Sequence, residues 1–491
     1  MNPDEYCLQD LIDKVESDDR ILQFRFQYKN MLVWPFVRVY AYWAKRGAEE
    51  GFVNNDLENK EVLAKKIKKK RRLQIIFTGL RMIFHMPFFW KQKDILYLYN
   101  SRENITIDGQ TCHRIYGDFV SEFSEQTGVI ETLGDSKYKK DKSIDKRYID
   151  SINLFIEILS YFSKNNPKDI QMADNLIDYL CNECGIDFSP YQSKKIKKTI
   201  LDFSIKIKCM DKILPKVFKT VRPKIVFVEC ADYGGSNAYI NKTLHEMGIK
   251  IAEAQHGIIG GYHEAYTHSD FLCNNAEYAE YMVDYFLGYG DYWLEKINIP
   301  GEKIALGNPW FWRQYTRFLN KKHNNQSDNH KKKTVLWIPF EDYKTDLDVL
   351  EGFIRDSNNE YNIRVRLHPI YNKFKSDYKK YEDDGKIIMD ELPTIYDSLD
   401  ISDYVVSERS TVIYEALAFG KPAFIFESEY SVAAETLTLG PNFKNAAELV
   451  NLLHNAQETT NVDPDNRSKF FGEQWQDKFK QFINRVLADC Q

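Results

Sequence analysis

The amino-acid sequence predicts an α/β protein in which parallel strands are covered by helices on both faces. Two observations lead to this prediction. Short apolar runs alternate with amphipathic helical segments between residues 223 and 256, and again, more regularly, between 334 and 426. The chain has 491 residues, of which 43% are hydrophobic, so it is long enough to bury the cores of at least two domains.

The first half of the chain contains one clear strand, helix, strand unit. The β-prone run 94–100 is expected to open the first sheet, and a long helical region is expected at 151–219. A buried strand then follows at 223–229, a helix at 236–247 and a second strand at 250–256. A segment of about thirty residues has the size of a βαβ unit, so the two strands are expected to be parallel.

The second half repeats this alternation. Strands are expected at 334–340, 362–369, 386–389, 403–407 and 421–426, and helices at 347–355, 394–399 and 410–419. We place the boundary between the two domains near 288–309. The chain is therefore expected to consist of an N-terminal helical segment at 1–92, a first α/β domain at 93–300, a second at 301–470 and a C-terminal helix at 471–491.

Charge and cysteine content limit the class of protein. The 67 basic and 72 acidic side chains give a net charge of −5, so no overall basic field favours nucleic acid. The opening residues 1–19 are polar and acidic and lack the apolar run of a secretory signal, and the eight cysteines are scattered. These features predict a protein of the reducing cytoplasm.

One segment predicts contact with a membrane surface. The basic run 65–72 continues directly into the apolar, Trp-ended stretch 73–90, which is interrupted by Arg81, His85 and Pro87. Such a stretch is expected to lie in the headgroup region rather than to span, and the basic run adds attraction to anionic lipid. We therefore expect peripheral association with the inner face of the cytoplasmic membrane. The alternative is an internal helix pair with a solvated basic end.

Polar residues follow two predicted strands in the first domain, at the position where open α/β sheets bind ligands. Glu229 and Asp232 come after the first strand and precede Gly234 and Gly235, which would let a ligand approach the backbone. A carboxylate there is a candidate general base, and we favour Asp232 because it is expected at the tip of a turn. His256 follows the next strand and is a second candidate, since its pKa lies near working pH. Turn-forming and structural roles are the alternatives.

A cluster of cations follows a strand of the second domain. Strand periodicity would place Arg364, Arg366 and His368 on one face, just before Pro369. Three cations at the end of a strand suit the phosphates of a nucleotide, which Arg binds with two parallel hydrogen bonds. The alternative, above all for Arg364, is a structural salt bridge.

The start of the helix expected at 410–419 is a second candidate phosphate site. Ser407, Ser410 and Thr411 lie where free backbone N–H groups and the helix dipole attract anions. Glu415 follows about one turn later, within reach of a ribose hydroxyl. An ordinary N-cap is the alternative for the serine and threonine.

These motifs occur in a fixed order: Asp232-x-Gly234, Gln255-His256-Gly257, Arg366-Leu-His368-Pro369, and Ser407-x-x-Ser410-Thr411-x-x-x-Glu415 followed by Gly420-Lys-Pro422. Over residues 220–430 the set resembles the GT-B superfamily that includes bacterial polysialyltransferases, capsule Kdo transferases and CDP-glycerol glycerophosphotransferases. The resemblance implies two Rossmann-like domains facing a central cleft, with extra N-terminal helices, and it implies that His368, Ser410 and Thr411 hold the donor phosphate. It assigns the base to Asp232 by comparison with the sialyltransferases and to His256 by comparison with the glycerophosphotransferases.

The function expected from this resemblance is glycosyl transfer. The donor would be a nucleotide-activated sugar of the CMP-sialic acid or Kdo type, and the acceptor a bacterial surface polysaccharide such as O-antigen or capsule, which can be lipid-linked. No metal or cofactor is expected, because cations and a helix start can stabilise the leaving nucleotide. The alternatives are a CDP-polyol phosphotransferase, a nucleotide-sugar 2-epimerase and a non-catalytic assembly scaffold.

Overall fold

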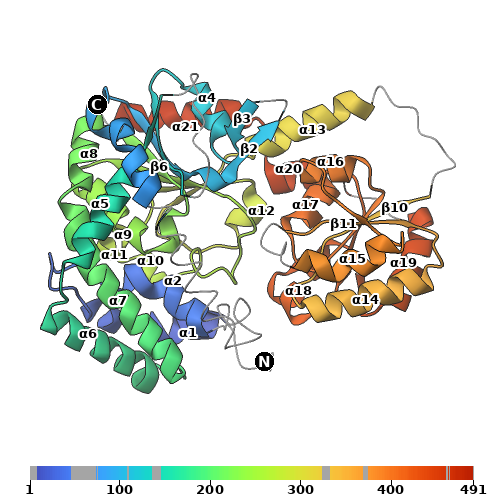
Figure 1. Cartoon of the computed structure of the whole chain (residues 1–491), viewed down its shortest axis with the longest axis horizontal. Coiled ribbons are helices and arrows are strands. Elements are labelled where there is room, and N and C mark those ends of the chain that lie inside the picture. The colour runs from blue at the N-terminus through green and yellow to red at the C-terminus, as the bar shows by residue number, and fades with distance from the viewer. Residues whose placement is uncertain are drawn as a thin grey trace. The chain divides into compact units, whose positions relative to one another are not determined.

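The computed structural model describes residues 8–45, 73, 76–107, 110–134, 145–322, 332–368, 374–459, 463 and 465–489. The chain divides into two compact units (Figure 1). Unit 1 comprises Met1–Gly288, Lys296–Ala305 and Gln476–Gln491, and unit 2 comprises Tyr289–Glu295 and Leu306–Trp475. The N-terminal segment and the last helix, expected as separate parts, both belong to unit 1.

A parallel sheet forms the centre of unit 1. Over the described residues, seven strands lie in the order β5-β4-β1-β6-β7-β8-β9, and every neighbouring pair is parallel. Numbered along the chain, this is the Rossmann order 3-2-1-4-5-6 with a seventh strand added. The strands are β1 (Ile95–Asn100), β4 (Thr127–Thr132), β5 (Lys146–Tyr148), β6 (Ile225–Val228), β7 (Lys250–Ala254), β8 (Tyr285–Gly288) and β9 (Glu302–Ala305), and a separate antiparallel hairpin joins β2 (Asn104–Ile107) to β3 (Gln110–His113).

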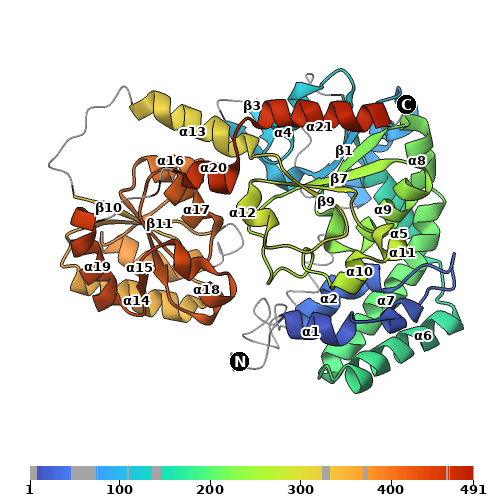
Figure 2. The same cartoon turned by 180° about the vertical axis from the view of Figure 1, so that it is seen from behind.

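Helices surround this sheet. They are α1 (Leu8–Val15), α2 (Trp34–Lys45), α4 (Gly117–Glu122), α5 (Asp150–Tyr161), α6 (Pro167–Asp178), α7 (Pro190–Asp211), α8 (Leu214–Val221), α9 (Ser236–Glu246), α10 (Asp270–Cys273), α11 (Ala276–Ala279) and α21 (Trp475–Asp489). The C-terminal helix α21 lies beside α4 in both views (Figure 1, Figure 2), and its Phe479 ring contacts Phe119 and Phe227. All four residues of β6 are buried, as expected for a parallel strand covered on both faces.

Unit 2 repeats the same plan. In the part of it that the structure describes, six parallel strands lie in the order β12-β11-β10-β13-β14-β15, again the Rossmann order. The strands are β10 (Thr334–Trp337), β11 (Asn362–Val365), β12 (Ile388–Met389), β13 (Tyr404–Ser407), β14 (Ala423–Phe426) and β15 (Asn442–Phe443). The helices are α12 (Asp291–Leu294), α13 (Pro309–Lys322), α14 (Tyr343–Asp356), α15 (Lys375–Asp383), α16 (Ile395–Asp400), α17 (Thr411–Ala418), α18 (Glu429–Ala433), α19 (Ala446–Thr459) and α20 (Asn466–Phe471).

The predicted fold class is confirmed. Two Rossmann-like α/β domains, with additional helices at the N-terminus, are the components of the GT-B plan that the sequence indicates. Among the described residues, no helix is both long enough and apolar enough to cross a membrane.

Within unit 1, a buried ion pair connects the N-terminal helices α1 and α2 to each other and to the rest of the unit. Arg38 Nε of α2 lies 2.6 Å from Glu16 Oε1, and the two side chains are 2% and 0% exposed. Glu16 also accepts hydrogen bonds from Trp34 and Tyr42, and Arg38 donates to the backbone oxygens of Glu264 and Thr267. A buried charge is tolerated when it is paired and hydrogen-bonded in this way, so α1 and α2 are held against the loop that follows β7.

Candidate functional site

In each unit, a glutamate connects the two strands at which the strand order reverses. Glu229 directly follows β6, and its Oε2 accepts the backbone N–H of Asn100, the last residue of β1, at 2.6 Å. In unit 2, Glu408 directly follows β13, and its Oε2 accepts the backbone N–H of Glu341, in the loop after β10, at 2.7 Å. This reversal is where doubly wound sheets bind nucleotides and substrates, so both strand-end regions are candidate sites.

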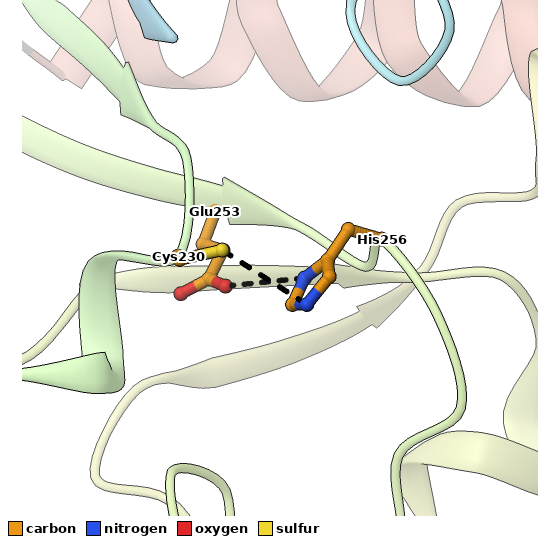
Figure 3. A group of neighbouring side chains, drawn as sticks. All are labelled: Cys230, Glu253 and His256. Carbon is orange, nitrogen blue, oxygen red and sulfur yellow. Dashed lines mark hydrogen bonds and ion pairs between the residues drawn. The ribbon is translucent and has the colours of Figure 1, made fainter. Parts of the chain in front are cut away.

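His256 lies at the centre of a polar cluster in unit 1, two residues after the end of β7. Its side chain is 24% exposed. Its Nε2 lies 3.2 Å from the Tyr233 hydroxyl and 3.9 Å from Cys230 Sγ, and its Nδ1 lies 3.4 Å from the Tyr266 hydroxyl and 3.9 Å from Glu253 Oε1. Figure 3 shows Cys230, in the turn after β6, and Glu253, in β7, near the imidazole ring.

The environment keeps the His256 ring neutral. Burial, with smaller contributions from His263 and Arg114, lowers the pKa of His256 to about 4. Burial also raises the pKa of Glu229 to about 7, against the opposing effect of the hydrogen bond from Asn100. At neutral pH His256 therefore has an unprotonated nitrogen that can accept a proton, and Glu229 is poised to carry or release one.

Asp232 does not lie at the tip of a turn, as its position in the sequence led us to expect. Its side chain is 2% exposed, and its Oδ1 accepts the backbone N–H of Val283 at 3.0 Å. Its own N–H is donated to Glu253 Oε2 at 3.1 Å, and burial raises the pKa of the Asp232 carboxyl. The carboxylate is therefore directed into the protein, which makes it a poor partner for an acceptor hydroxyl.

The two glycines after Asp232 also have a different role from the one we expected. Gly234 has φ +74°, and a Cβ there would lie 2.3 Å from the backbone oxygen of Pro35. The N–H of Gly235 is donated to the backbone oxygen of Phe36 at 3.1 Å. These glycines therefore allow α2 to pack closely against the turn, rather than admitting a ligand.

Cys230, Glu253 and His256 are the group of described side chains that comes close enough together to hold a metal ion. The thiol and the carboxylate face different nitrogens of the ring, and an ion uses only one of them. Glu253 already accepts hydrogen bonds from Tyr266 and from Asp232 N–H, and burial raises the pKa of the Cys230 thiol. This geometry favours a hydrogen-bonded cluster, and transfer without a metal stays a prediction.

In unit 2, the strand end and the helix start divide the predicted phosphate ligands into two groups. Ser410 is the N-cap of α17 and accepts the N–H of Val412 at 3.3 Å, and Thr411 is the first helical residue. Both are partly exposed. Ser407 is 1% exposed, and its hydroxyl has no hydrogen-bond partner among the described residues. Glu415 is 8% exposed and accepts the hydroxyl of Tyr396 at 2.6 Å, so its carboxylate is already engaged.

The predicted cation cluster is only partly assembled. The strand expected at 362–369 ends at Val365, so Arg366 and His368 do not follow its periodicity. Arg364 and Arg366 both approach Asp390, at 3.7 and 3.5 Å, which is the salt-bridge alternative. Arg366 also donates to the backbone oxygen of Leu392 at 3.0 Å and to the Ser398 hydroxyl at 2.9 Å. His368 is exposed, and Pro369 lies outside the described residues.

Several residues of these sites were not predicted. Tyr233 stands between two residues that were considered, and Tyr266 follows His256 by ten positions, so no local pattern connects them. Glu253 lies inside β7 and has the sequence neighbours of a core position. Glu408 directly follows a predicted strand, and this position at a strand end was the one sign in the sequence that it belongs to a site.

Known proteins resemble the chain in two ways. Residues 312–484 match the family described as CDP-glycerol:poly(glycerophosphate) glycerophosphotransferase. Among solved structures, the UDP-GlcNAc 2-epimerase of Neisseria meningitidis bound to UDP-GlcNAc is 11% identical, with a TM-score of 0.45 over 80% of this chain and 99% of that chain. The wall teichoic acid polymerase TagF, soaked with CDPG, is 12% identical, with a TM-score of 0.40 over 81% of this chain and 85% of that one. No curated protein matches the chain.

The family match supports an enzyme of glycosyltransferase type that uses a nucleotide-derived donor. It covers most of unit 2 and part of α21, and it leaves the His256 cluster outside the matched residues. It gives no support to the CMP-sialic acid or Kdo donor that the sequence led us to favour. Among the alternatives, it favours the CDP-polyol phosphotransferase.

Proposed function

We propose that the protein transfers a polyol phosphate, such as glycerol phosphate, from a CDP-linked donor to a hydroxyl group of a bacterial surface polymer. The observation that carries this proposal is the match of residues 312–484 to the CDP-glycerol glycerophosphotransferase family. The geometry of unit 1 supports it, because His256 offers a neutral, partly exposed ring at the end of a central strand.

In this reaction the acceptor oxygen attacks the β-phosphorus of the donor. The bond from that phosphorus to the bridging oxygen breaks, CMP leaves with the electron pair, and the hydroxyl proton passes to His256 Nε2. General-base catalysis of this kind contributes roughly 10²–10⁴-fold. His256 is a better base than Asp232, whose carboxylate is buried against the backbone of Val283.

Unit 2 would hold the donor. The N-terminus of α17 offers an anion the positive end of the helix dipole and the partly exposed Ser410 and Thr411, and the exposed His368 adds a hydrogen-bond donor. These groups stabilise the charge that develops on the departing CMP. Arg366 would act indirectly, by fixing the Leu392 carbonyl and Ser398 near the strand end.

The nature of the released nucleotide and of the product tests this proposal. Purified protein is incubated with CDP-glycerol labelled at the β-phosphate and, separately, with CMP-sialic acid, UDP-GlcNAc and CDP-linked sugars, each with a hydroxyl-bearing acceptor polymer. Polyol phosphate transfer releases CMP and leaves the labelled phosphate on the polymer. Release of a nucleoside diphosphate, or consumption of CMP-sialic acid with no use of CDP-glycerol, would show sugar transfer instead.

A second part of the proposal concerns where the enzyme acts. The basic run 65–72 lies outside the described residues, but most of the apolar stretch that follows is described. It forms short helical pieces rather than one helix, and it exposes Phe77 (71%), Leu80 (56%) and Phe84 (91%). We propose that these side chains insert into the inner leaflet, where a lipid-linked acceptor would be found.

Helix α5 contacts this segment and carries a second exposed apolar surface. Ser151 Oγ at its start donates to the backbone oxygen of Gly79 at 2.6 Å, so the two segments are in contact. The far part of α5 exposes Phe155, Ile158 and Leu159, and Phe162 is exposed directly after the helix ends. These four residues follow the i, i+3, i+4, i+7 spacing of one helical face. A helix that buries one face in the core and exposes a second apolar face suits insertion at a membrane surface.

Vesicle binding tests this surface. The double variant Phe155→Ser/Phe162→Ser should bind anionic phosphatidylglycerol vesicles at least about tenfold more weakly, because two large apolar side chains no longer leave water. The control is Ile401→Ser/Val432→Ser, which removes two exposed apolar side chains (48% and 59%) of unit 2. Equal binding by wild type and the α5 variant would refute the membrane role of α5.

A further inference from the structure

A line of hydrogen bonds passes through the ring of His256. Tyr233 lies between two histidines: its hydroxyl is 3.2 Å from His256 Nε2 and 2.9 Å from His263 Nε2. On the far side of His256, Nδ1 is 3.4 Å from the Tyr266 hydroxyl, and that hydroxyl is bonded to Glu253 Oε1. Each hydroxyl has a single proton, so the positions of the protons along this line depend on one another.

A backbone amide fixes the direction of the line. The N–H of Ala265 points to His263 Nδ1 at 3.3 Å, and a backbone amide can only donate. Because Nδ1 accepts this N–H, the ring proton of His263 lies on Nε2, which donates to the Tyr233 oxygen. Tyr233 then has its own proton left to donate, and its partner is His256 Nε2.

The other end of the line agrees with this assignment. Glu253 Oε1 accepts the Tyr266 hydroxyl, so the Tyr266 oxygen is left to accept from His256. The proton of the neutral His256 ring therefore lies on Nδ1, and Nε2 is the nitrogen with a lone pair. Both ends of the line lead to the same tautomer.

We propose that Tyr233, oriented by His263, is a positioning residue that holds His256 in the Nδ1–H form with Nε2 as the basic nitrogen. The proposal rests on the proposed function, in which Nε2 takes the proton of the acceptor hydroxyl. In the free enzyme the Tyr233 hydroxyl occupies the place of that hydroxyl as the donor to Nε2. An acceptor that binds productively replaces one O–H donor by another, so the ring keeps its tautomer throughout.

The tautomer can be measured without the reaction. Protein labelled with ¹⁵N-histidine gives well separated signals for protonated and unprotonated ring nitrogens, and the His256→Gln and His263→Gln variants assign the two rings. Wild type is expected to show an unprotonated Nε2 in His256 and an unprotonated Nδ1 in His263. A proton on Nε2 of His256 in the wild type would overturn the proposal, whatever the enzyme transfers.

Tyr233→Phe is the decisive variant, because it keeps the ring and removes the hydroxyl. The His256 signals should then become a mixture of both tautomers, and the pKa of His256 should rise, since a hydrogen bond to the neutral ring has been lost. The matched control is Tyr278→Phe, which removes a buried hydroxyl that makes no hydrogen bond with the described residues. Unchanged His256 signals in Tyr233→Phe would refute the role of Tyr233.

Kinetics separate this proposal from the proposed function. Loss of one orienting hydrogen bond should lower kcat of Tyr233→Phe about 2- to 10-fold and leave the KM for the donor unchanged. A rise in KM with constant kcat would instead assign Tyr233 to substrate binding. If His256→Ala keeps full activity, His256 is not the base. The NMR measurement still tests the tautomer of His256, because it does not depend on the reaction.

Discussion

The two units share a scaffold and differ in what surrounds its strand ends. In both, the strands follow the Rossmann order, and a glutamate directly after the fourth strand accepts a backbone N–H from the residues at or just after the end of the first. In unit 1 this region continues into the rings of Tyr233, His256 and His263, whose hydrogen bonds connect them to one another. In unit 2 it continues into a helix N-terminus and an exposed histidine.

This difference separates two kinds of chemistry on one fold. A neutral imidazole with fixed partners is suited to accepting a proton, whereas free N–H groups at a helix start are suited to holding an anion. The family match covers only the anion-holding side. A substitution at the site of unit 1 should therefore impair the chemical step, whereas a substitution at the site of unit 2 should impair donor binding.

The largest effect is expected in unit 1. His256→Ala should lower kcat by roughly 10²–10⁴-fold, because the general base is lost, while the affinity for the donor nucleotide stays near wild type. The comparison variant is Asp232→Asn, which keeps an oxygen for the Val283 N–H and should retain most of the activity. Steady-state kinetics with CDP-glycerol measure both. An inactive Asp232→Asn beside an active His256→Ala would reverse the assignment.

The next effect is expected in unit 2 and should appear in binding. His368→Ala should weaken donor affinity about tenfold, the value of one good hydrogen bond to a phosphate, because the exposed side chain is available to the donor. The measurement is the rise in unfolding temperature with added CDP or CDP-glycerol. If the variant has normal affinity and a reduced kcat, His368 acts in the transition state and not in binding of the donor.

The sequence predicted the parallel strands and the helix that carry these sites because their signals are local. The buried run of β6 and the start of α17 each lie within a few consecutive residues. Strands β8 and β9 were missed, since each has four residues and lies among loops, and β9 has two exposed positions.

The surroundings of the site residues were harder to predict, because they depend on contacts between distant segments. Helix α2 determines the shape of the turn at Asp232, because the backbone oxygen of Pro35 fills the space beside Gly234. The partners of His256 come from 23 residues before it and 10 residues after it. Neither the burial of Asp232 nor the hydrogen bonds of His256 can be derived from the spacing of motifs.

The raised pKa of Glu229 in unit 1 predicts that the stability of the protein depends on pH. The pKa of Glu229 is raised to about 7, so in the folded protein it stays protonated at pH values where the unfolded chain is ionised. Its contribution to stability is therefore fully present below about pH 4.5 and is lost as the pH rises through about 7. Relative to Glu229→Gln, wild type should lose about 1–2 kcal/mol of unfolding free energy between pH 4.5 and 8, after allowance for partial exposure. Urea unfolding at a series of pH values measures this difference, and parallel curves would contradict the raised pKa.

The smallest effect is expected from a pair of serines in unit 2. Ser407→Ala removes a hydroxyl that is 1% exposed and has no partner among the described residues, so it should leave donor affinity unchanged and stability unchanged or slightly higher. Ser410→Ala removes the N-cap of α17, which should cost about 1 kcal/mol, and it also removes a hydroxyl beside the proposed phosphate site. Thermal unfolding with and without CDP measures both variants. If Ser407→Ala abolishes the stabilisation by CDP, the nucleotide reaches the end of β13 itself, and the buried strand end rather than the helix start holds the phosphate.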